Sequence, residues 1–456
     1  MMKSGTLKNN LLEMKNKIVD LKTNKTFLSC ALLTVLYLIS GYWKWLEIGM
    51  SLTALTFMAI LPLQGSLCIF MFLHNFTLSN IGYDSCYLVT IIGYTIILIV
   101  KYWLGVKNGT YTYHKKIVNL IICFYTISTA LSLFQNIYRG SWMYYVYLPI
   151  IFLLVAMRKD LNIFQGMNYM FGGLAVSCAL AMFSLILPGF QYVVFLNKRF
   201  SGFINNPNYL YMRAIFVLAY YMFRYLSKNL SLLKFCAIYS ICAGITLATL
   251  SKAGIGVLAL FTILFVILFL KDDFKQRIKI VGIFVLVGLV IALLGYKLII
   301  ELFERFATDF KAGNFLNSLL TGRDDIWNAY YNAITASPFK FLFGHGLLAQ
   351  EVYIPAQLET RASHNFYLFL LYRFGMVGTI MLGYIIYQII KLALNDKPRF
   401  IAYLPLIFIA VESLFDNTFK PYNITYFAFA IMILIMSVSQ NKTEENQKIK
   451  QKSTKS

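Results

Sequence analysis

Four groups of polar residues interrupt the long apolar runs of this chain, and each joins a cation or a histidine to small or turn-forming neighbours. They are Lys198-Arg199-Phe200-Ser201-Gly202 with Asn205-Asn206-Pro207-Asn208, Ser251-Lys252-Ala253-Gly254, Gly322-Arg323 through Trp327 to Gly344-His345-Gly346, and Ser363-His364-Asn365 through Arg373 to Gly375. Arginine and lysine can hold a phosphate or carboxylate, and histidine can accept a proton near neutral pH. The groups therefore suggest proton transfer beside an anionic ligand.

The cations also have structural interpretations. Lys198 and Arg199 can anchor the chain to lipid headgroups, and the Asn-Asn-Pro-Asn sequence that follows is typical of a turn. Lys252 stands alone between two apolar runs, as cations do at the end of a membrane span, although its small neighbours would let a backbone approach a ligand closely. Arg323 can pair with a neighbouring aspartate.

The segment that begins near Arg323 predicts an amphipathic helix. Thr321 can cap it, and Asp324 and Asp325 favour a helix N-terminus. Apolar and aromatic residues then recur at helical spacing, so one face can lie on a membrane: Ile326, Trp327, Tyr330, Tyr331 and Ile334. Adjacent helical carboxylates diverge by about 100°, so we expect no metal site on the two aspartates.

His364 opens a long apolar run, where it can act as a proton acceptor or serve only in ring stacking or capping. His345, between two glycines, is interpreted as a turn residue. Arg373, Glu412 and Asp416 lie in apolar runs. Ionisable residues inside membranes are functional candidates, but Glu412 and Asp416 can simply pair with Arg373, and we favour that structural interpretation for them.

The elements that position these groups are membrane helices. Hydrophobic residues make up 59% of the 456 residues, charged residues only 13%, and mean hydropathy is +0.66, whereas a soluble protein has about 25% charged residues. The apolar runs are continuous, as in spanning helices. Pro62 and Gln64 make residues 47–79 either a tight hairpin or a re-entrant kink. The predicted fold is an all-α polytopic membrane protein with 12–14 transmembrane helices.

The distribution of lysine and arginine predicts cytoplasmic termini. Most of the net charge of +22 then lies on the cytoplasmic side, where it reports topology and attraction to anionic lipid, so no nucleic-acid partner is needed. The expected divisions are a Lys-rich cytoplasmic N-terminus (1–26), an N-terminal membrane bundle (27–196), a catalytic membrane region (197–438) and a disordered cytoplasmic tail (439–456). The catalytic region contains a long extracytoplasmic loop, 301–363, with short amphipathic helices, and long loops usually carry function.

Familiar soluble-enzyme and metal motifs are missing. The sequence has no Walker loop, HExxH or GxSxG motif, and its seven cysteines are scattered in or beside apolar runs, as small buried hydrophobes are. We expect neither a disulfide framework nor a metal site.

Taken in this order, the four groups resemble the O-antigen ligase and polymerase superfamily, bacterial membrane enzymes that join lipid-linked saccharides outside the cytoplasmic membrane. The resemblance covers residues 199–378, and its most specific element is the long outer loop before a span led by histidine. It implies a glycan donor on undecaprenyl diphosphate, held by Arg199 and Arg323, with His364 as general base. Lys252 stands where the family usually has arginine, which leaves a point charge without the bidentate fork.

The resemblance further implies an inverting glycosyltransferase that needs no metal or other cofactor. Trp327, Asn365, Arg373 and Asp416 are candidate saccharide or supporting contacts. We favour a polymerase that builds capsule, exopolysaccharide or O-antigen from lipid-linked repeat units, because the aromatic outer loop suits saccharide stacking. The alternatives are ligase-type transfer to a different acceptor, a flippase for the same lipid-linked unit, and a non-catalytic scaffold. Expected partners are membrane lipids and the flippase and chain-length regulator of the same pathway.

Overall fold

The computed structural model describes residues 24–43, 45–76, 85–108, 115–133, 162–189, 194–196, 199–204, 206–270, 323–354, 359–393 and 400–415, with 278, 282, 300, 426, 429–434 and 437. They divide into two compact units, one from Met1–Leu104 with Asp160–Asn206 and one from Gly105–Lys159 with Pro207–Ser456. The tail at 439–456, Asp416, and most of the N-terminus and of the first part of the outer loop lie outside the described residues.

The described chain is helical apart from two short antiparallel hairpins, which confirms the predicted all-α membrane fold. Among the described residues, three helices are long and apolar enough to cross a membrane: Ile163–Ser184, Lys252–Leu270 and Phe366–Gln388. Shorter apolar helices accompany them. The total of 12–14 spans and the predicted division boundaries stay predictions.

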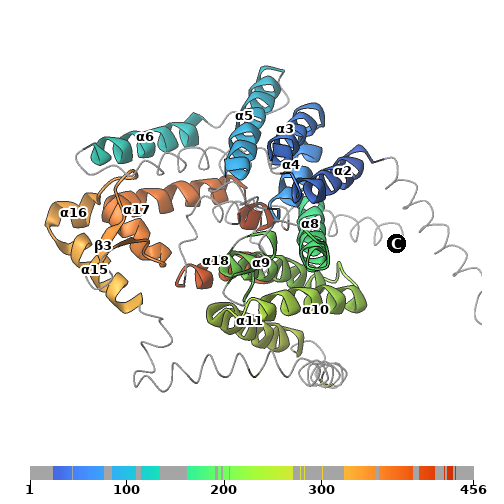
Figure 1. The fold of residues 1–456 in the computed structure, drawn as a ribbon. Coiled ribbons are helices and arrows are strands. Elements are labelled where there is room, and N and C mark those ends of the chain that lie inside the picture. The colour runs from blue at the N-terminus through green and yellow to red at the C-terminus, as the bar shows by residue number, and fades with distance from the viewer. Residues whose placement is uncertain are drawn as a thin grey trace, which may run out of the picture. The chain divides into compact units, whose positions relative to one another are not determined.

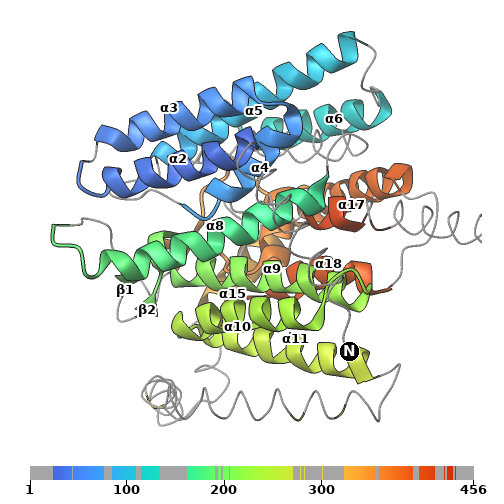
Figure 2. The same ribbon diagram turned by 90° about the vertical axis from the view of Figure 1, so that its right-hand side faces the viewer.

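The first unit consists of α2 (Lys25–Ser40), α3 (Trp45–Ile60), α4 (Leu63–Leu73), most of α5 (Ser85–Lys107) and α8 (Ile163–Ser184) (Figure 2). Side-chain caps begin two of these helices. The Asn24 Oδ1 accepts the Thr26 N–H at 3.0 Å, and the Asn162 Oδ1 accepts the Gln165 N–H at 3.1 Å. Asparagine is favoured at such positions because it satisfies an N–H that the helix itself leaves unpaired.

A break separates α3 from α4 within residues 47–79, and the choice between a hairpin and a re-entrant kink stays a prediction. Pro62 separates the helices, and α4 has only 11 residues, or about 16 Å of helix. The Ser66 Oγ donates to the Met58 carbonyl at 2.6 Å, and the Lys101 Nζ lies 2.8 Å from the same Oγ. Carbonyls freed by the break therefore have side-chain donors, as buried backbone requires.

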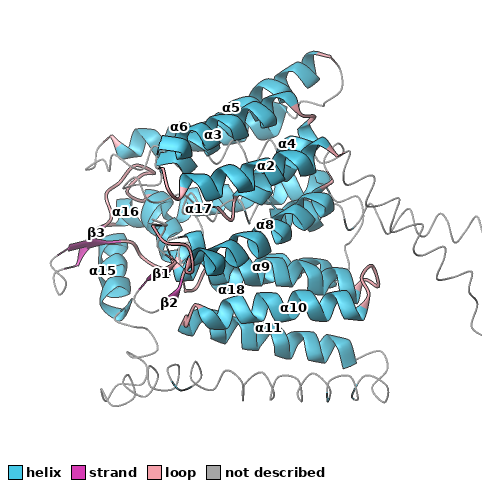
Figure 3. Ribbon diagram, turned by 45° about the vertical axis from the view of Figure 1, so that its right-hand side comes forward, coloured by secondary structure: helices cyan, strands magenta, loops and turns pink. Residues whose placement is uncertain are grey.

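The second unit is built around α9 (Pro207–Leu226), which packs against α10 (Leu232–Ala248), α11 (Lys252–Leu270) and α18 (Leu404–Glu412) (Figure 3). Every residue of α9 from Leu210 to Phe223 is buried, including Arg213. A helix that is apolar and buried on all sides belongs in the interior of a bundle. Helix α9 is thus the central element of this unit.

The later part of the outer loop packs on α17 (Phe366–Ala393). It contains α15 (Arg323–Thr335), α16 (Pro338–Phe343) and the hairpin of β3 (Val352–Ile354) with β4 (Glu359–Arg361) (Figure 1). Ile326, Tyr330 and Ile334 of α15 are buried in one cluster with Ile354 and Tyr372. The apolar face predicted to lie on a membrane therefore packs inside the protein, because the hairpin and α17 cover it.

Helix α17 is broken at Gly375, whose φ of 61° and ψ of −172° are not helical. The carbonyls of Tyr372 and Arg373 accept instead the N–H groups of His345 and Gly346, both at 2.8 Å. Added Cβ atoms at Gly344 or Gly375 would lie about 2.5 Å from backbone of the opposite segment. Glycine is needed at this contact both for its positive φ and for the close approach of the two backbones.

Candidate functional site

Three of the four polar groups meet around the C-terminal end of α18, which we call the α18 end and define as residues 412–415. The N-termini of α9, α11, α15 and α17 all belong to the same compact unit. The contacts described below join each of these N-termini to the α18 end, directly or through one intermediate residue.

Lys252 enters this region at the first turn of α11. Its neighbour Ser251 donates through Oγ to the Asn208 Oδ1 at 3.2 Å. A Cβ at Gly254 would lie 2.6 Å from the ring of Tyr211, so α11 and α9 touch here as only glycine permits. The Tyr211 hydroxyl then donates to the Glu412 Oε1 at 2.6 Å. Half-buried Lys252 therefore lies beside the junction of α9, α11 and α18.

Arg323 is the first residue of α15, and its Nη1 donates to the Phe415 carbonyl. One helical turn later on the same face, the Trp327 Nε1 donates to the Ser363 carbonyl at 3.0 Å. The guanidinium is half-buried. The first two turns of α15 are thus hydrogen-bonded to the α18 end, through Arg323, and to the residue that precedes His364, through Trp327.

His364 occupies a tightly fixed turn, with a φ of 47° that is rare for a residue with a side chain. The Asn365 Oδ1 caps α17 by accepting the Leu368 N–H at 3.1 Å, and its Nδ2 donates to the Leu414 carbonyl at 3.3 Å. The Phe366 N–H donates to the Ser413 carbonyl at 2.8 Å. Non-glycine residues keep such backbone conformations where the surroundings over-determine them, often at functional sites.

Charges of both signs meet in the region. The N-termini of four helices lie there, and each carries partial positive charge and N–H groups without intrahelical partners. Lys252 and Arg323 add two formal positive charges, whereas Glu412, Asp324, Asp325 and the carbonyl end of α18 contribute negative charge. Phosphate binding by the two cations and proton transfer to His364 stay predictions.

Arg373 has a structural role. It is only 2% exposed, its Nη1 donates to the Leu347 carbonyl, and its guanidinium lies 5.2 Å from the centre of the Phe369 ring. The guanidinium therefore attaches the Gly-His-Gly loop to α17. Glu412, proposed to pair with it, accepts the Tyr211 hydroxyl, and Asp416 lies outside the described residues.

His345 is a packing residue in a turn. Its ring stacks on Tyr372 with centroids 4.4 Å apart, and its Nε2 lies 3.2 Å from the Ala333 carbonyl. Burial lowers the pKa of His345, the charges of Lys340 and Arg373 lower it further, and the hydrogen bond to Ala333 opposes them. The choice of His364 over His345 as the base stays a prediction, which this buried setting supports.

Arg199 belongs to the first unit. It pairs with Leu196 in the hairpin of β1 (Phe195–Leu196) and β2 (Arg199–Phe200), and it is half-buried. Ser201 closes the turn by donating its N–H to the Val194 carbonyl at 2.9 Å, and the ring of Phe203 packs 5.0 Å from that of Tyr37. These contacts hold the turn around Arg199 in a defined conformation. Joint action of Arg199 with Arg323 stays a prediction. Lys198 and Asn205 lie outside the described residues.

Several contributors could not be identified from the sequence. Ser363, Leu414 and Phe415 take part through backbone carbonyls, which carry no residue-type signal. Tyr211 lies inside an aromatic-rich apolar run and resembles a packing residue until its hydroxyl meets Glu412.

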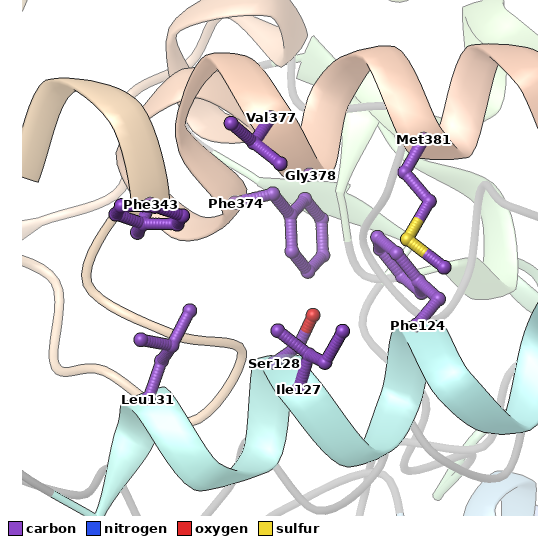
Figure 4. A pocket seen from close by; sticks show the side chains of 9 residues that line it. All are labelled: Phe124, Ile127, Ser128, Leu131, Phe343, Phe374, Val377, Gly378 and Met381. Carbon is purple, nitrogen blue, oxygen red and sulfur yellow. The ribbon is translucent and has the colours of Figure 1, made fainter.

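An apolar cavity of about 40 Å³ lies elsewhere in this unit, between α6 (Lys115–Ser132) and α17 (Figure 4). Its lining consists of Phe124, Ile127, Ser128, Leu131, Phe343, Phe374, Val377, Gly378 and Met381. Only Ser128 among these has a polar side chain, so the cavity suits neither a phosphate nor a sugar.

Comparison with known proteins identifies the region that contains most of the site. Residues 235–383, about a third of the chain, match the family model described as O-Antigen ligase. No curated protein and no solved structure matches the chain. The matched segment includes Lys252, Arg323, Trp327, His364 and Arg373. The match confirms the predicted resemblance to the O-antigen ligase and polymerase superfamily over these residues.

Proposed function

We propose that this integral membrane protein is a polymerase of undecaprenyl-diphosphate-linked oligosaccharide repeat units. It works at the outer side of the bacterial cytoplasmic membrane, has both termini in the cytoplasm, and produces capsule, exopolysaccharide or O-antigen. The family match supports an O-antigen ligase or polymerase type of function. The choice of polymerase rests on the aromatic residues of the outer loop, which suit saccharide stacking.

In the proposed reaction, the acceptor hydroxyl oxygen attacks the anomeric carbon of the donor. The new C–O bond forms as the bond to the diphosphate breaks, and undecaprenyl diphosphate leaves with the electron pair. His364 takes the hydroxyl proton, and attack opposite the leaving group inverts the anomeric centre. Arg323 and Arg199 stabilise the charge that develops on the diphosphate, so the mechanism needs no metal ion. Lys252 adds a point charge.

One observation carries this proposal. Arg323, Asn365 next to His364 and, through Tyr211, the Ser251–Gly254 turn are all joined to residues 412–415, although they lie far apart in the sequence. Cations and a histidine anchored to one helix end would supply what transfer from a lipid diphosphate requires, namely charge stabilisation for the leaving group and a base for the acceptor.

Deletion of the gene, with analysis of surface glycan and lipid-linked glycan together, tests the proposal. A polymerase mutant should lose polymer and accumulate single repeat units on lipid at the outer face. Finished polymer retained on lipid would instead indicate a ligase, and single units trapped at the inner face would indicate a flippase.

A further inference from the structure

Helix α16 exposes apolar side chains that the described residues do not cover. None of its six residues is buried, and Phe339, Phe341 and Leu342 are 59%, 41% and 42% exposed. The helix is nevertheless well formed, because Pro338 suits its first turn and the Ser337 Oγ accepts the Lys340 N–H at 3.2 Å. Exposed apolar patches of this kind are typical of surfaces that meet a partner.

The break at Gly375 marks a change in the environment of α17. Before the break, side chains such as Phe369, Tyr372 and Phe374 are buried in the protein. After it, Val377 and Ile380 are 48% and 66% exposed, within a helix apolar enough to span. The part of α17 beyond Gly375 has 18 residues, or about 27 Å, close to the roughly 30 Å of a bilayer's hydrocarbon core.

Helix α6 ends beside the loop that follows α16, near the break in α17. It also has 18 residues, and its last turn meets the loop that follows α16. The Leu347 N–H donates to the Ser128 carbonyl at 3.2 Å, and the Leu348 N–H donates to the Ser132 Oγ at 2.9 Å. The end of α16 lies there as well, since a Cβ on Gly375 would come 2.4 Å from the Leu342 carbonyl oxygen.

We propose that α16 lies in the membrane interface, on the side of the candidate site, with Phe339 and Leu342, which share one helix face, inserted at the boundary between headgroups and acyl chains. Its partner is bilayer lipid, because α16 packs against α17, whose face beyond Gly375 is apolar and exposed. Helices with aromatic and aliphatic residues on one face lie in the membrane interface in this way. Residues 366–374 then stand clear of the hydrocarbon. The inference does not depend on glycan transfer.

Photo-crosslinking of the full-length protein in phosphatidylglycerol–phosphatidylethanolamine nanodiscs tests this placement. Benzoyl-phenylalanine replaces Phe339, replaces Ile380 as a site in the exposed face of the span, or replaces Tyr331, which is 62% exposed on α15. Mass spectrometry then measures lipid adducts.

We expect positions 339 and 380 to yield adducts at least about tenfold above position 331, since only the first two would meet acyl chains. Adducts at 380 with a yield at 339 no higher than that at 331 would overturn the proposal, because α15 packs on the part of α17 that precedes the break.

Discussion

Arg323, in the first turn of α15, donates a hydrogen bond to a neutral acceptor, the Phe415 carbonyl. A diphosphate oxygen is a stronger acceptor because it carries formal charge, and the guanidinium has further N–H groups in a fixed fork. Under the proposed function, the Phe415 carbonyl would hold one guanidinium nitrogen of Arg323 while the remaining N–H groups bind the diphosphate. Donor binding would then need little rearrangement. This explains why an arginine, and not a lysine, would be required at this position.

We predict that Arg323→Lys lowers the rate of glycan transfer by about 10-fold or more and that Arg323→Ala lowers it by about 100-fold or more, since a hydrogen bond to a charged group contributes roughly 1.5–3 kcal/mol. Transfer by purified protein in lipid vesicles measures both. Equal activity of the lysine variant and the wild type would show that the bidentate fork is not used.

Trp327 should position His364 through one hydrogen bond, from its Nε1 to the Ser363 carbonyl. Trp327→Phe keeps an aromatic ring but removes the Nε1 donor together with the five-membered part of the indole. We expect kcat to fall by about 5-fold, for a bond of roughly 1 kcal/mol, with KM for the donor unchanged.

Tyr331→Phe is the matched control for Trp327→Phe, because it alters one ring of the same helix at a residue 62% exposed. It should behave as wild type. An increase in KM with unchanged kcat for Trp327→Phe would assign Trp327 to substrate binding and not to positioning.

At the scale of the elements, the break in α17 decides how the outer loop attaches. Gly375→Ala would place a Cβ 2.4 Å from the Leu342 carbonyl oxygen at a φ of 61°, whereas Gly383→Ala, in the same helix, meets nothing within 4 Å. We predict that the first substitution destabilises the protein by about 1–3 kcal/mol or more and that the second is neutral or stabilising by about 0.5–1 kcal/mol.

Thermal unfolding of the two glycine variants in detergent, followed by size-exclusion chromatography, measures the difference. If Gly375→Ala unfolded at the same temperature as Gly383→Ala, the close contact between α17 and the Gly-His-Gly loop would not exist.

The presence of several of these helices and turns could be predicted from the sequence. The two aspartates after Arg323 and the helical spacing from Ile326 to Ile334 indicated α15, and the structure begins that helix at Arg323. Local signals did not reveal that the apolar face of α15 packs inward, nor that Gly375 breaks α17, because both depend on partners distant in the sequence. For the same reason, Gly344-His345-Gly346 was predicted as a turn, but its docking on α17 was not.

At the scale of the whole molecule, the described helix ends fit the predicted sidedness. In the second unit, α9 and α17 carry Arg224 and Lys391 in their last turns, while their first turns lie at the candidate site. The positive-inside rule places such cationic ends in the cytoplasm. The contribution of Arg199 from the first unit could be predicted only through the family resemblance, because no single motif relates the two units.

Reporter fusions test this orientation. We predict that a fluorescent protein that folds only in the cytoplasm is bright when fused after Ser456. Alkaline phosphatase, which is active only outside the cytoplasm, should be active when fused after Gly346. The positive-inside rule predicts that Ser456 and Gly346 lie on opposite sides of the membrane. The reverse pair of signals would reverse the predicted orientation and place the candidate site on the cytoplasmic side.

The most direct test of the central claim is transfer by the purified protein in vesicles supplied with a lipid-linked repeat unit, with His364→Ala compared with wild type. His345→Gln serves as the matched histidine control, since His345 packs against Tyr372 away from the α18 end. We predict that His364→Ala lowers the transfer rate by about 10²- to 10⁴-fold, as loss of a general base does, with an unchanged unfolding temperature, while His345→Gln transfers at a rate near wild type per folded molecule. Wild-type transfer by His364→Ala would contradict the account.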